Sequence, residues 1–385
     1  EKKALSRIKD LTGLKVEIWA AKSIAEAFDS LGIPYPKTEK NAPSFTKSFL
    51  STHNHELAKS ILQAREYNKS KNTFMDGLMK HVGKDNRIHG HINQIRSDDG
   101  GTVSGRVSMA NPNLQQIPAR HPDLGPMIRS VFLPEEGEQW ASIDYSQQEP
   151  RILVHFAAAY QDGTGLIMPK VDKFVDGYTN DPDMDFHDMV AELADIPRKQ
   201  AKTINLGMMY GMGVGKLSDQ LDLSKEEAKE LMEQYDHRVP FVKKLMRAVQ
   251  DRVQNGNSEG SIRSLLGRKC RFPHFEPKAF GMHKTMTYDE AIAHYGPNVS
   301  LQRAYAYKAL NRLIQASAAD MTKRAMVDLY QQGVVPLLQV HDELAFSVKN
   351  EEEAKELAET MCNAIQLKVP MKTDIEIGPS WGGSM

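Results

Sequence analysis

The chain has 385 residues, of which 40% are apolar and 26% charged, and its formal net charge is −1. Its length predicts two or three domains or subdomains, and the lack of an 18-residue apolar run or an N-terminal signal core argues against membrane insertion and secretion. Two cysteines cannot form a disulfide framework or a cysteine-based zinc site, so we expect a reducing, intracellular location.

The first 80 or so residues are predicted to be helical. Apolar residues recur at three- and four-residue spacing in 24–31 and 55–69, and a turn-rich connector separates the two segments. This periodicity fades between residues 87 and 151. Within that stretch, residues 140–145 predict a short strand, and a helix is expected to follow as far as Tyr160.

The middle of the chain alternates between helical and irregular patterns. Residues 161–184 are rich in Gly, Pro and Asp and predict a surface insertion. Residues 185–252 predict helices interrupted at 211–215 and near Pro240. Residues 272–298 predict an irregular stretch.

The last 85 residues predict helix, strand, strand, helix and strand. The helices are expected at 304–331 and 351–367, and the closing strand at 372–377. The two middle strands, 334–340 and 344–348, predict a hairpin with acidic residues near its turn.

The first motif that could carry chemistry is Trp-Ala-Ser-Ile-Asp-Tyr-Ser-Gln-Gln-Glu-Pro-Arg, residues 140–151. It places Asp144 at the end of an apolar strand, where an exposed carboxylate could bind a metal. Asp is also a favoured helix N-cap, and the segment taken alone favours that simpler interpretation.

A second motif, Gln-Val-His-Asp-Glu-Leu at residues 339–344, places two adjacent carboxylates between apolar strands. An ordinary hairpin turn would prefer Asn-Gly or Asp-Gly. A carboxylate from this turn and Asp144 could share one site, where they would repel each other unless cations bridged them. Oxygen ligands without nearby cysteine favour Mg²⁺ or Mn²⁺, and paired ions of this kind support phosphoryl transfer.

The third motif, residues 198–211, contains four residues spaced four apart. Arg198, Lys202, Leu206 and Tyr210 would form one stripe on a helix. Its cations could meet phosphates and its apolar part a base or sugar, while His187 from the preceding helix could add a phosphate donor. A solvated basic face explains this segment equally well when it is taken alone.

Together, the three motifs resemble those of the family A DNA polymerases, the group that includes the Klenow fragment. The first and second resemble the family's catalytic motifs, and the third resembles the nucleotide-binding helix of the fingers. Residues 102–108 and 112–118, Thr-Val-Ser-Gly-Arg-Val-Ser and Pro-Asn-Leu-Gln-Gln-Ile-Pro, resemble a block that lies along the primer–template. The ending Gly-Pro-Ser-Trp-Gly, residues 378–382, resembles the family's C-terminus, so the resemblance covers nearly the whole chain.

The resemblance implies four groups of site residues. Metal binding is implied for Asp144, Asp342 and the Tyr145 carbonyl. The catalytic carboxylates are Asp144, Asp342 and, in a secondary role, Glu343. The residues expected to contact the nucleotide are Tyr145, Gln147, Glu149, His187, Arg198, Lys202, Leu206 and Tyr210. The residues expected to contact DNA are Arg106, Asn311, Gln315 and His341.

Several of these roles are specific. Glu149 resembles the steric gate that rejects a ribose 2′-hydroxyl, and Arg198 and Lys202 resemble triphosphate clamps. Arg106 and Gln315 resemble readers of the minor groove. Because minor-groove acceptors are common to all correct pairs, such readers can check pair shape without reading sequence.

The implied fold is α+β, a right-hand polymerase fold with an antiparallel palm sheet, helical fingers and a helical thumb. The thumb would comprise residues 1–86 and the fingers residues 153–304. The palm would combine residues 87–152 and 305–385.

The implied reaction adds dNMPs from dNTPs to a primer 3′-OH on template DNA and releases pyrophosphate. It would use two Mg²⁺ ions, for which Mn²⁺ may substitute, and serve DNA replication or repair. We expect a monomer with no membrane partner, which could work with a helicase or other replisome factors. No acidic motif set for a 3′–5′ exonuclease is present in these residues; such a domain could precede Glu1 in a longer parent.

The chain departs from the family pattern at a few positions. Leu206 stands where Phe or Tyr is usual, which predicts altered incorporation of nucleotide analogues. Gln148 and Pro150 replace aliphatic residues, and Tyr307 stands where arginine is common. These features favour a bacteriophage or organellar branch, and therefore the cytoplasm of an infected host cell or an organelle.

Two other functions are compatible with parts of this pattern. A single-subunit RNA polymerase shares the palm and a similar fingers helix, although Glu149 argues against it. A catalytically inactive DNA-binding subunit would not need intact Asp144, Asp342, Lys202 and Arg198.

Overall fold

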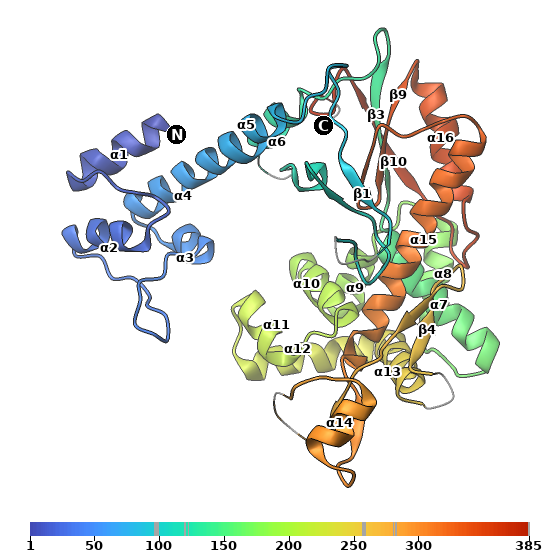
Figure 1. The fold of residues 1–385 in the computed structure, drawn as a ribbon. Coiled ribbons are helices and arrows are strands. Elements are labelled where there is room, and N and C mark those ends of the chain that lie inside the picture. Colours follow the sequence, from blue (N-terminus) through green and yellow to red (C-terminus); the bar gives the residue numbers. More distant parts are fainter. Residues whose placement is uncertain are drawn as a thin grey trace. The chain divides into compact units, whose positions relative to one another are not determined.

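The computed structural model describes residues 1–95, 100–118, 121, 123–255, 259–279, 281 and 283–383. Internal contacts divide the chain into two compact units, both visible in Figure 1. The N-terminal unit comprises Glu1–His91 and Ala110–Ile128, and the C-terminal unit comprises Ile92–Met109 and Arg129–Met385. Residues 87–91 and 110–128 of the segment expected to form the first part of a palm therefore group with the N-terminal helices.

The N-terminal unit is helical, as its periodicity predicts. Its helices are α1 (Lys2–Thr12), α2 (Ala21–Ser30), α3 (Lys47–Thr52), α4 (Glu56–Lys69) and α5 (Asp76–Met79), with a π-helical turn (Ser70–Met75) between the last two. Later in the chain come a 3₁₀ turn (Leu114–Gln116) and α6 (Leu124–Arg129). Ile24 and Phe28 of α2 pack with Leu57 and Ile61 of α4 in one core, which explains the three- and four-residue spacing.

The C-terminal unit contains a four-stranded antiparallel sheet in the order β10-β3-β9-β8. Its strands are β3 (Gln139–Tyr145), β8 (Leu338–Val340), β9 (Glu343–Val348) and β10 (Thr373–Gly378). Val340 pairs with Glu343, so His341 and Asp342 form the hairpin turn, and His341 has a left-handed φ of 58°. The expected hairpin with acidic residues at its turn is confirmed.

One face of this sheet is buried beneath two helices. The helices are α15 (Ala309–Gln331) and α16 (Glu351–Asn363), seen beside the sheet in Figure 1. Ile143 and Phe346 point into this core, which also contains Met321 of α15 and Leu357 of α16. Because side chains alternate along a strand, the residues between them lie on the opposite face.

A helical layer continues from β3. Its members are α7 (Gln148–Thr164), α8 (Val171–Asn180), α9 (Phe186–Ala194), α10 (Arg198–Met209), α11 (Val214–Leu221), α12 (Lys225–Arg238) and α13 (Pro240–Gln254). The breaks expected near 211–215 and Pro240 are confirmed. Pro240 is the first residue of α13, where its missing N–H costs no helical hydrogen bond.

The prediction that residues 161–184 are only a surface insertion was wrong. Helix α8 lies within this segment and buries Val171, Phe174 and Tyr178 in the core of the helical layer. Their spacing of three and four residues is helical, but the surrounding Gly and Asp residues obscured it.

The stretch at 272–298 also contains regular structure. Strand β6 (Phe275–Pro277) pairs with β7 (Leu301–Arg303), and α14 (Tyr288–Tyr295) lies between them in the sequence. Two further short pairs are β1 (His91–Asn93) with β2 (Ser108–Ala110) and β4 (Ser261–Arg263) with β5 (Lys269–Arg271). Strands of three residues are too short to produce a readable alternation, so the expectation of an irregular stretch was wrong.

Two other boundaries differ from those expected. The predicted helix 304–331 begins at Ala309, because Tyr305 has a left-handed φ of 61° and a 3₁₀ turn (Ala306–Lys308) follows. The predicted strand 334–340 is reduced to β8 after Pro336, which lacks a backbone donor for the ladder. Among the described residues, no helix has the length and apolar character needed to cross a membrane.

His155 on α7 provides a pH-dependent test of this fold. Its Nδ1 accepts the backbone N–H of Lys368 at 3.0 Å, and burial together with the Lys368 charge lowers the pKa of His155 from 6.5 to about 4. The unfolded chain therefore takes up a proton first, so stability is lost as the pH falls from 6.5 towards 4. Relative to the wild type, His155→Gln should gain about 2 kcal/mol between pH 7 and pH 4.5 in urea unfolding. Equal pH dependence of the two proteins would contradict this assignment.

Candidate active site

The open face of the four-stranded sheet has an acidic edge. Asp144 of β3 lies opposite Glu343 of β9 on one side and Asp374 of β10 on the other. Asp342 precedes β9 in the hairpin turn, and its carbonyl accepts the Tyr145 N–H at 3.4 Å. The antiparallel register thus brings together carboxylates that are far apart in the sequence.

Electrostatic repulsion and partial loss of hydration act on both aspartates. The Asp144 side chain remains accessible to solvent, yet the protein around it and the charges of Asp342, Glu343 and Asp374 raise the pKa of Asp144 to about 8. Burial also raises the pKa of Asp342, and the Arg106 charge opposes that rise. Among the described residues, no ion pair neutralises either aspartate.

This donor set fits divalent cations of the magnesium type. Hard carboxylate oxygens are the preferred ligands of Mg²⁺, which commonly takes one or two carboxylates and completes its shell with water and substrate phosphates. In the described part of the chain, no three side chains of the His, Cys, Asp or Glu type converge as a metal cage. Asp144 and Asp342, with the Tyr145 carbonyl, therefore fit an open site better than a closed structural one.

Two hydrogen bonds fix the Glu343 carboxylate in place. Its Oε1 accepts the Ser142 hydroxyl at 2.7 Å and the Trp381 indole N–H at 3.2 Å. Ser142 and Glu343 are 201 residues apart in the sequence, so this bond ties two strands of the sheet together. Trp381 also stacks on Trp140, near the start of β3, with ring centroids 5.9 Å apart, which packs the C-terminal segment against this strand.

A second group of site residues forms a hydrogen-bonded network. Arg106 Nη2 donates to Glu149 Oε1 at 2.7 Å, and the Tyr210 hydroxyl donates to Glu149 Oε2 at 3.1 Å. Gln315 Nε2 in turn donates to the Tyr210 hydroxyl at 3.3 Å. Burial, followed by the Glu149 charge, raises the pKa of Tyr210. Arg106 and Tyr210 thus converge on the Glu149 carboxylate, and Gln315 joins the network through Tyr210.

Helix α10 presents the expected stripe. Arg198 and Lys202 are exposed, Leu206 is half-buried against the core of the helical layer, and Tyr210 is exposed at the helix end. Arg198 is oriented by Asp185 at 2.7 Å and Asp188 at 2.6 Å, and these carboxylates raise the pKa of Arg198.

His187 is buried beneath this stripe. Its Nδ1 lies 2.9 Å from Asn205 Nδ2, and burial lowers the pKa of His187 below its ordinary value. When the amide N–H donates to Nδ1, the proton of the neutral ring resides on Nε2, which can then donate to an acceptor. The buried Asn205 Oδ1 has no partner within the described residues.

The sequence of the whole chain matches a known protein family. The family model "DNA polymerase family A" matches residues 2–383. The chain belongs to DNA polymerase family A. A DNA-directed DNA polymerase of Pseudomonas phage M6 is 37% identical over 430 residues, covering 100% of this chain and 60% of the phage protein. DNA polymerase I of Bacillus subtilis (strain 168) is 32% identical over 376 residues, covering 92% and 38%.

Solved structures lead to the same classification. The family A chain matches the POL domain of Pol1 from M. smegmatis, in a complex with DNA primer-template and dNTP, with a TM-score of 0.76 and 30% sequence identity. The match covers 100% of this chain and 64% of that one. The chain spans about 60% of the length of the phage relative, and both phage and bacterial polymerases are among its relatives.

The other predicted site residues of this family A chain lie at the start of α7, on α15 and in the hairpin turn. Gln147 has a left-handed φ of 53°, and its Oε1 accepts the Phe186 N–H at 2.7 Å while its Nε2 donates to the Met184 carbonyl at 3.0 Å. Its side chain thus connects the start of α7 to α9. Asn311 lies one turn before Gln315 on α15, and the exposed His341 occupies the hairpin turn.

Arg151 is a positioning residue that the sequence did not reveal. It is fully buried on α7 and donates to the carbonyls of Ser146 at 3.0 Å, Pro182 at 2.6 Å and Pro370 at 2.6 Å. Its guanidinium lies 4.3 Å from the Tyr178 ring centroid. These contacts hold the β3–α7 connection, which carries Asp144 and Glu149. A charged residue in a helix usually indicates a solvated face, so no local signal distinguished it.

Two departures from the family pattern have structural explanations. Pro150 lies in the first turn of α7, where proline is tolerated. Gln148 is buried, and its Nε2 approaches the Ala318 carbonyl at 3.4 Å and the Thr322 hydroxyl at 3.3 Å on α15. The polar substitution therefore joins two helices.

Proposed function

We propose that this chain is the polymerase region of a DNA-directed DNA polymerase, which transfers dNMPs from dNTPs to a primer 3′-OH opposite a DNA template and releases pyrophosphate. The observation that carries the proposal has two parts. Asp144 lies opposite Glu343, the neighbour of Asp342, and Arg106, whose charge acts on Asp342, belongs to the Arg106–Glu149–Tyr210–Gln315 network. Family membership supports it, and DNA replication or repair is the corresponding cellular process.

The aspartates supply the charge that the reaction requires. Asp144 and Asp342 would hold two Mg²⁺ ions, for which Mn²⁺ may substitute, with the Tyr145 carbonyl as a further ligand. Such ions neutralise phosphate charge and activate the attacking oxygen. Ser142 and Trp381 hold Glu343 as a neighbouring acid that maintains the negative potential of this edge.

Helix α10 provides the triphosphate site. Arg198 and Lys202 bind the phosphates as exposed cations, and the neutral Nε2–H of His187 adds a donor. Asp185 and Asp188 orient Arg198 before the substrate arrives, which reduces the entropy that its side chain loses on binding. Leu206 contacts the sugar or base, and Gln147 acts through the α7–α9 connection.

The network around Glu149 selects the sugar and the base pair. Arg106 and Tyr210 fix the Glu149 carboxylate, where it excludes a ribose 2′-hydroxyl. Arg106 and Gln315 contact the minor groove of the new pair, and Asn311 and His341 contact the primer–template.

The palm would consist of residues 87–152 and 305–385, with fingers at 153–304 and a thumb at 1–86. The four-stranded sheet is consistent with the proposed palm, and helices α7–α13 are consistent with the proposed fingers. We further propose that the polymerase region acts as a monomer on primer–template DNA.

Primer extension on a defined primed template tests this function. With Mg²⁺, the chain should extend the primer with dNTPs but not with rNTPs, and EDTA should abolish extension, because only the carboxylates would remain at the reacting phosphate. Excess Mg²⁺ or Mn²⁺ should restore it. Extension with rNTPs alone would favour an RNA polymerase, and DNA binding without any extension would contradict catalysis by this chain.

Leu206 predicts a change in sugar discrimination. Leu206→Tyr should increase use of dideoxynucleotides about tenfold, because its hydroxyl can replace one hydrogen bond lost with the 3′-OH. Leu206→Phe provides the matched ring without that hydroxyl and should show a smaller change. Single-nucleotide incorporation kinetics would measure both, and identical selectivity in all three proteins would contradict a sugar contact at position 206.

A further inference from the structure

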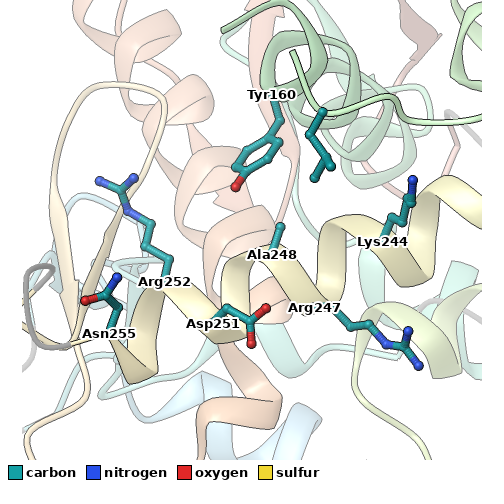
Figure 2. A pocket seen from close by; sticks show the side chains of 8 residues that line it. Tyr160, Lys244, Arg247, Ala248, Asp251, Arg252 and Asn255 are labelled. Atoms are coloured by element: carbon teal, nitrogen blue, oxygen red, sulfur yellow. The ribbon is translucent and has the colours of Figure 1, made fainter. Parts of the chain in front are cut away.

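A pocket of about 620 Å³ lies in the C-terminal unit between α13 and the end of α7. Figure 2 shows Tyr160 pointing toward α13 across this pocket. Tyr160 lies about 16 Å along α7 from Glu149, at 1.5 Å per residue, so the pocket is separate from the candidate active site.

One wall of the pocket is an exposed polar stripe of α13. Lys244, Arg247 and Asp251 recur at the three- and four-residue spacing of one helix face. Arg252 lies next to Asp251, and Asn255 directly follows the helix. The opposite face of the helix buries Leu245 and Val249 in the core. The stripe carries three cations and one anion, although the whole chain has a net charge of −1. The stripe therefore carries a local excess of positive charge.

The other wall is largely apolar. It contains Tyr160 and Leu166, and Leu166 is 42% exposed. The next residue, Ile167, is 68% exposed, which is unusual for an isoleucine. Lys244 Nζ donates to the Ile167 carbonyl at 3.1 Å, which holds this loop beside α13. The two walls together require a ligand with both anionic and apolar groups.

We propose that this pocket binds an acidic peptide segment of a partner protein, with an apolar side chain of the peptide against Tyr160 and Leu166. Carboxylates of the segment pair with Arg247, Lys244 and Arg252. Charge complementarity across such a surface increases the association rate and selects the partner, while the central apolar contact contributes affinity.

The composition of the pocket favours a peptide over single-stranded nucleic acid. Asp251 places a negative charge within the cationic stripe. A continuous phosphate backbone has no donor to offer it, whereas a peptide can place a backbone N–H against Asp251 between its own carboxylates. Nucleic-acid grooves also present successive aromatic faces for base stacking, and here only Tyr160 is aromatic beside the aliphatic Leu166.

Fluorescence anisotropy on the full chain can test this proposal. The probe is a fluorescein-labelled peptide of ten residues, nine Asp or Glu and one central Phe, and a second probe has Ala in place of Phe. Arg247→Glu should weaken binding of the Phe probe about tenfold. Lys349→Glu, an equal charge reversal at an exposed site between β9 and α16, should change it less than twofold. Primer extension of each variant serves as the folding control.

A double comparison tests the apolar wall. Leu166→Ala should weaken binding of the Phe probe while leaving the weaker Ala probe unchanged, because only the former contacts Leu166. The proposal would be overturned if the wild type did not bind the Phe probe, or if Arg247→Glu and Lys349→Glu weakened its binding equally. It would also be overturned if oligo(dT) displaced the probe and bound more tightly than the probe does.

Discussion

Asp342→Asn should reduce the rate of primer extension by about 10³-fold or more, with DNA binding retained. The substitution preserves shape but removes one of the two charges that would hold cations at the reacting phosphate. Asp144→Asn should have an effect of the same order for the same reason. Single-turnover incorporation of one dNTP at saturating DNA measures both variants without interference from product release.

Asp374→Asn is the matched control for these variants. Asp374 lies directly opposite Asp144 in the sheet, but it is exposed and lies 3.5 Å from the Lys372 ammonium. Its removal should change extension by less than about tenfold, the effect of a nearby charge rather than of a ligand. If Asp374→Asn reduced primer extension as much as Asp342→Asn, the activity would depend on the total negative charge of this edge and not on Asp144 and Asp342 as ligands.

The same variants separate catalysis from folding. In EDTA at pH above 8, Asp144→Asn should be as stable as the wild type or more stable by about 1 kcal/mol, because it removes repulsion between carboxylates. The sign follows from the raised pKa of Asp144, about 8: its ionisation costs folded-state stability as the pH rises. Urea unfolding in EDTA would show this, and marked destabilisation of Asp144→Asn would indicate a structural role instead.

The second large effect is expected at Glu149. Glu149→Ala should increase rNTP incorporation relative to dNTP by about 10²-fold, because it removes the carboxylate that we propose excludes a ribose 2′-hydroxyl. The dNTP rate itself should decline, since Arg106 and Tyr210 lose their common acceptor. Competition between one dNTP and its rNTP at a single template position measures the ratio.

Two further variants identify the cause of that selectivity. Glu149→Gln keeps the side-chain volume and should keep most discrimination if steric exclusion dominates. Tyr210→Phe removes the hydrogen bond of 3.1 Å to Glu149 but preserves the ring. If Tyr210→Phe alone relaxed selectivity as much as Glu149→Ala, the position of the carboxylate, and not its bulk, would determine sugar choice. An unchanged ratio in Glu149→Ala would rule out Glu149 as the gate.

The local pattern was sufficient for the long elements. Apolar spacing predicted α2, α4, β3 and α16 because each packs one continuous face on a core. It did not reveal α8, since Gly and Asp on the exposed side obscured Val171, Phe174 and Tyr178. Nor did it reveal β6, whose three residues are too few to show a period.

The residues of the candidate site also fall into those that local motifs revealed and those that they did not. The residue types and their order indicated the polymerase family before any geometry was known, because Asp144, Arg198, Lys202 and Asp342 stand in motifs of fixed local spacing. The supporting residues had no such motif. Arg151, Ser142, Asn205 and Trp381 act on partners distant in the sequence, which local spacing does not reveal.

The sequence by itself thus determined the family, the main helices and the chemical types of the site residues, since these depend on nearest neighbours along the chain. The tertiary structure decided which carboxylates share one sheet edge, which raises the pKa of Asp144. It also decided that Arg106 and Tyr210 converge on Glu149, that Gln315 contacts Tyr210, and that a cationic stripe of α13 faces Tyr160. The physical reason is that strand register and helix packing are set by contacts between distant segments, and those contacts place charges within each other's range.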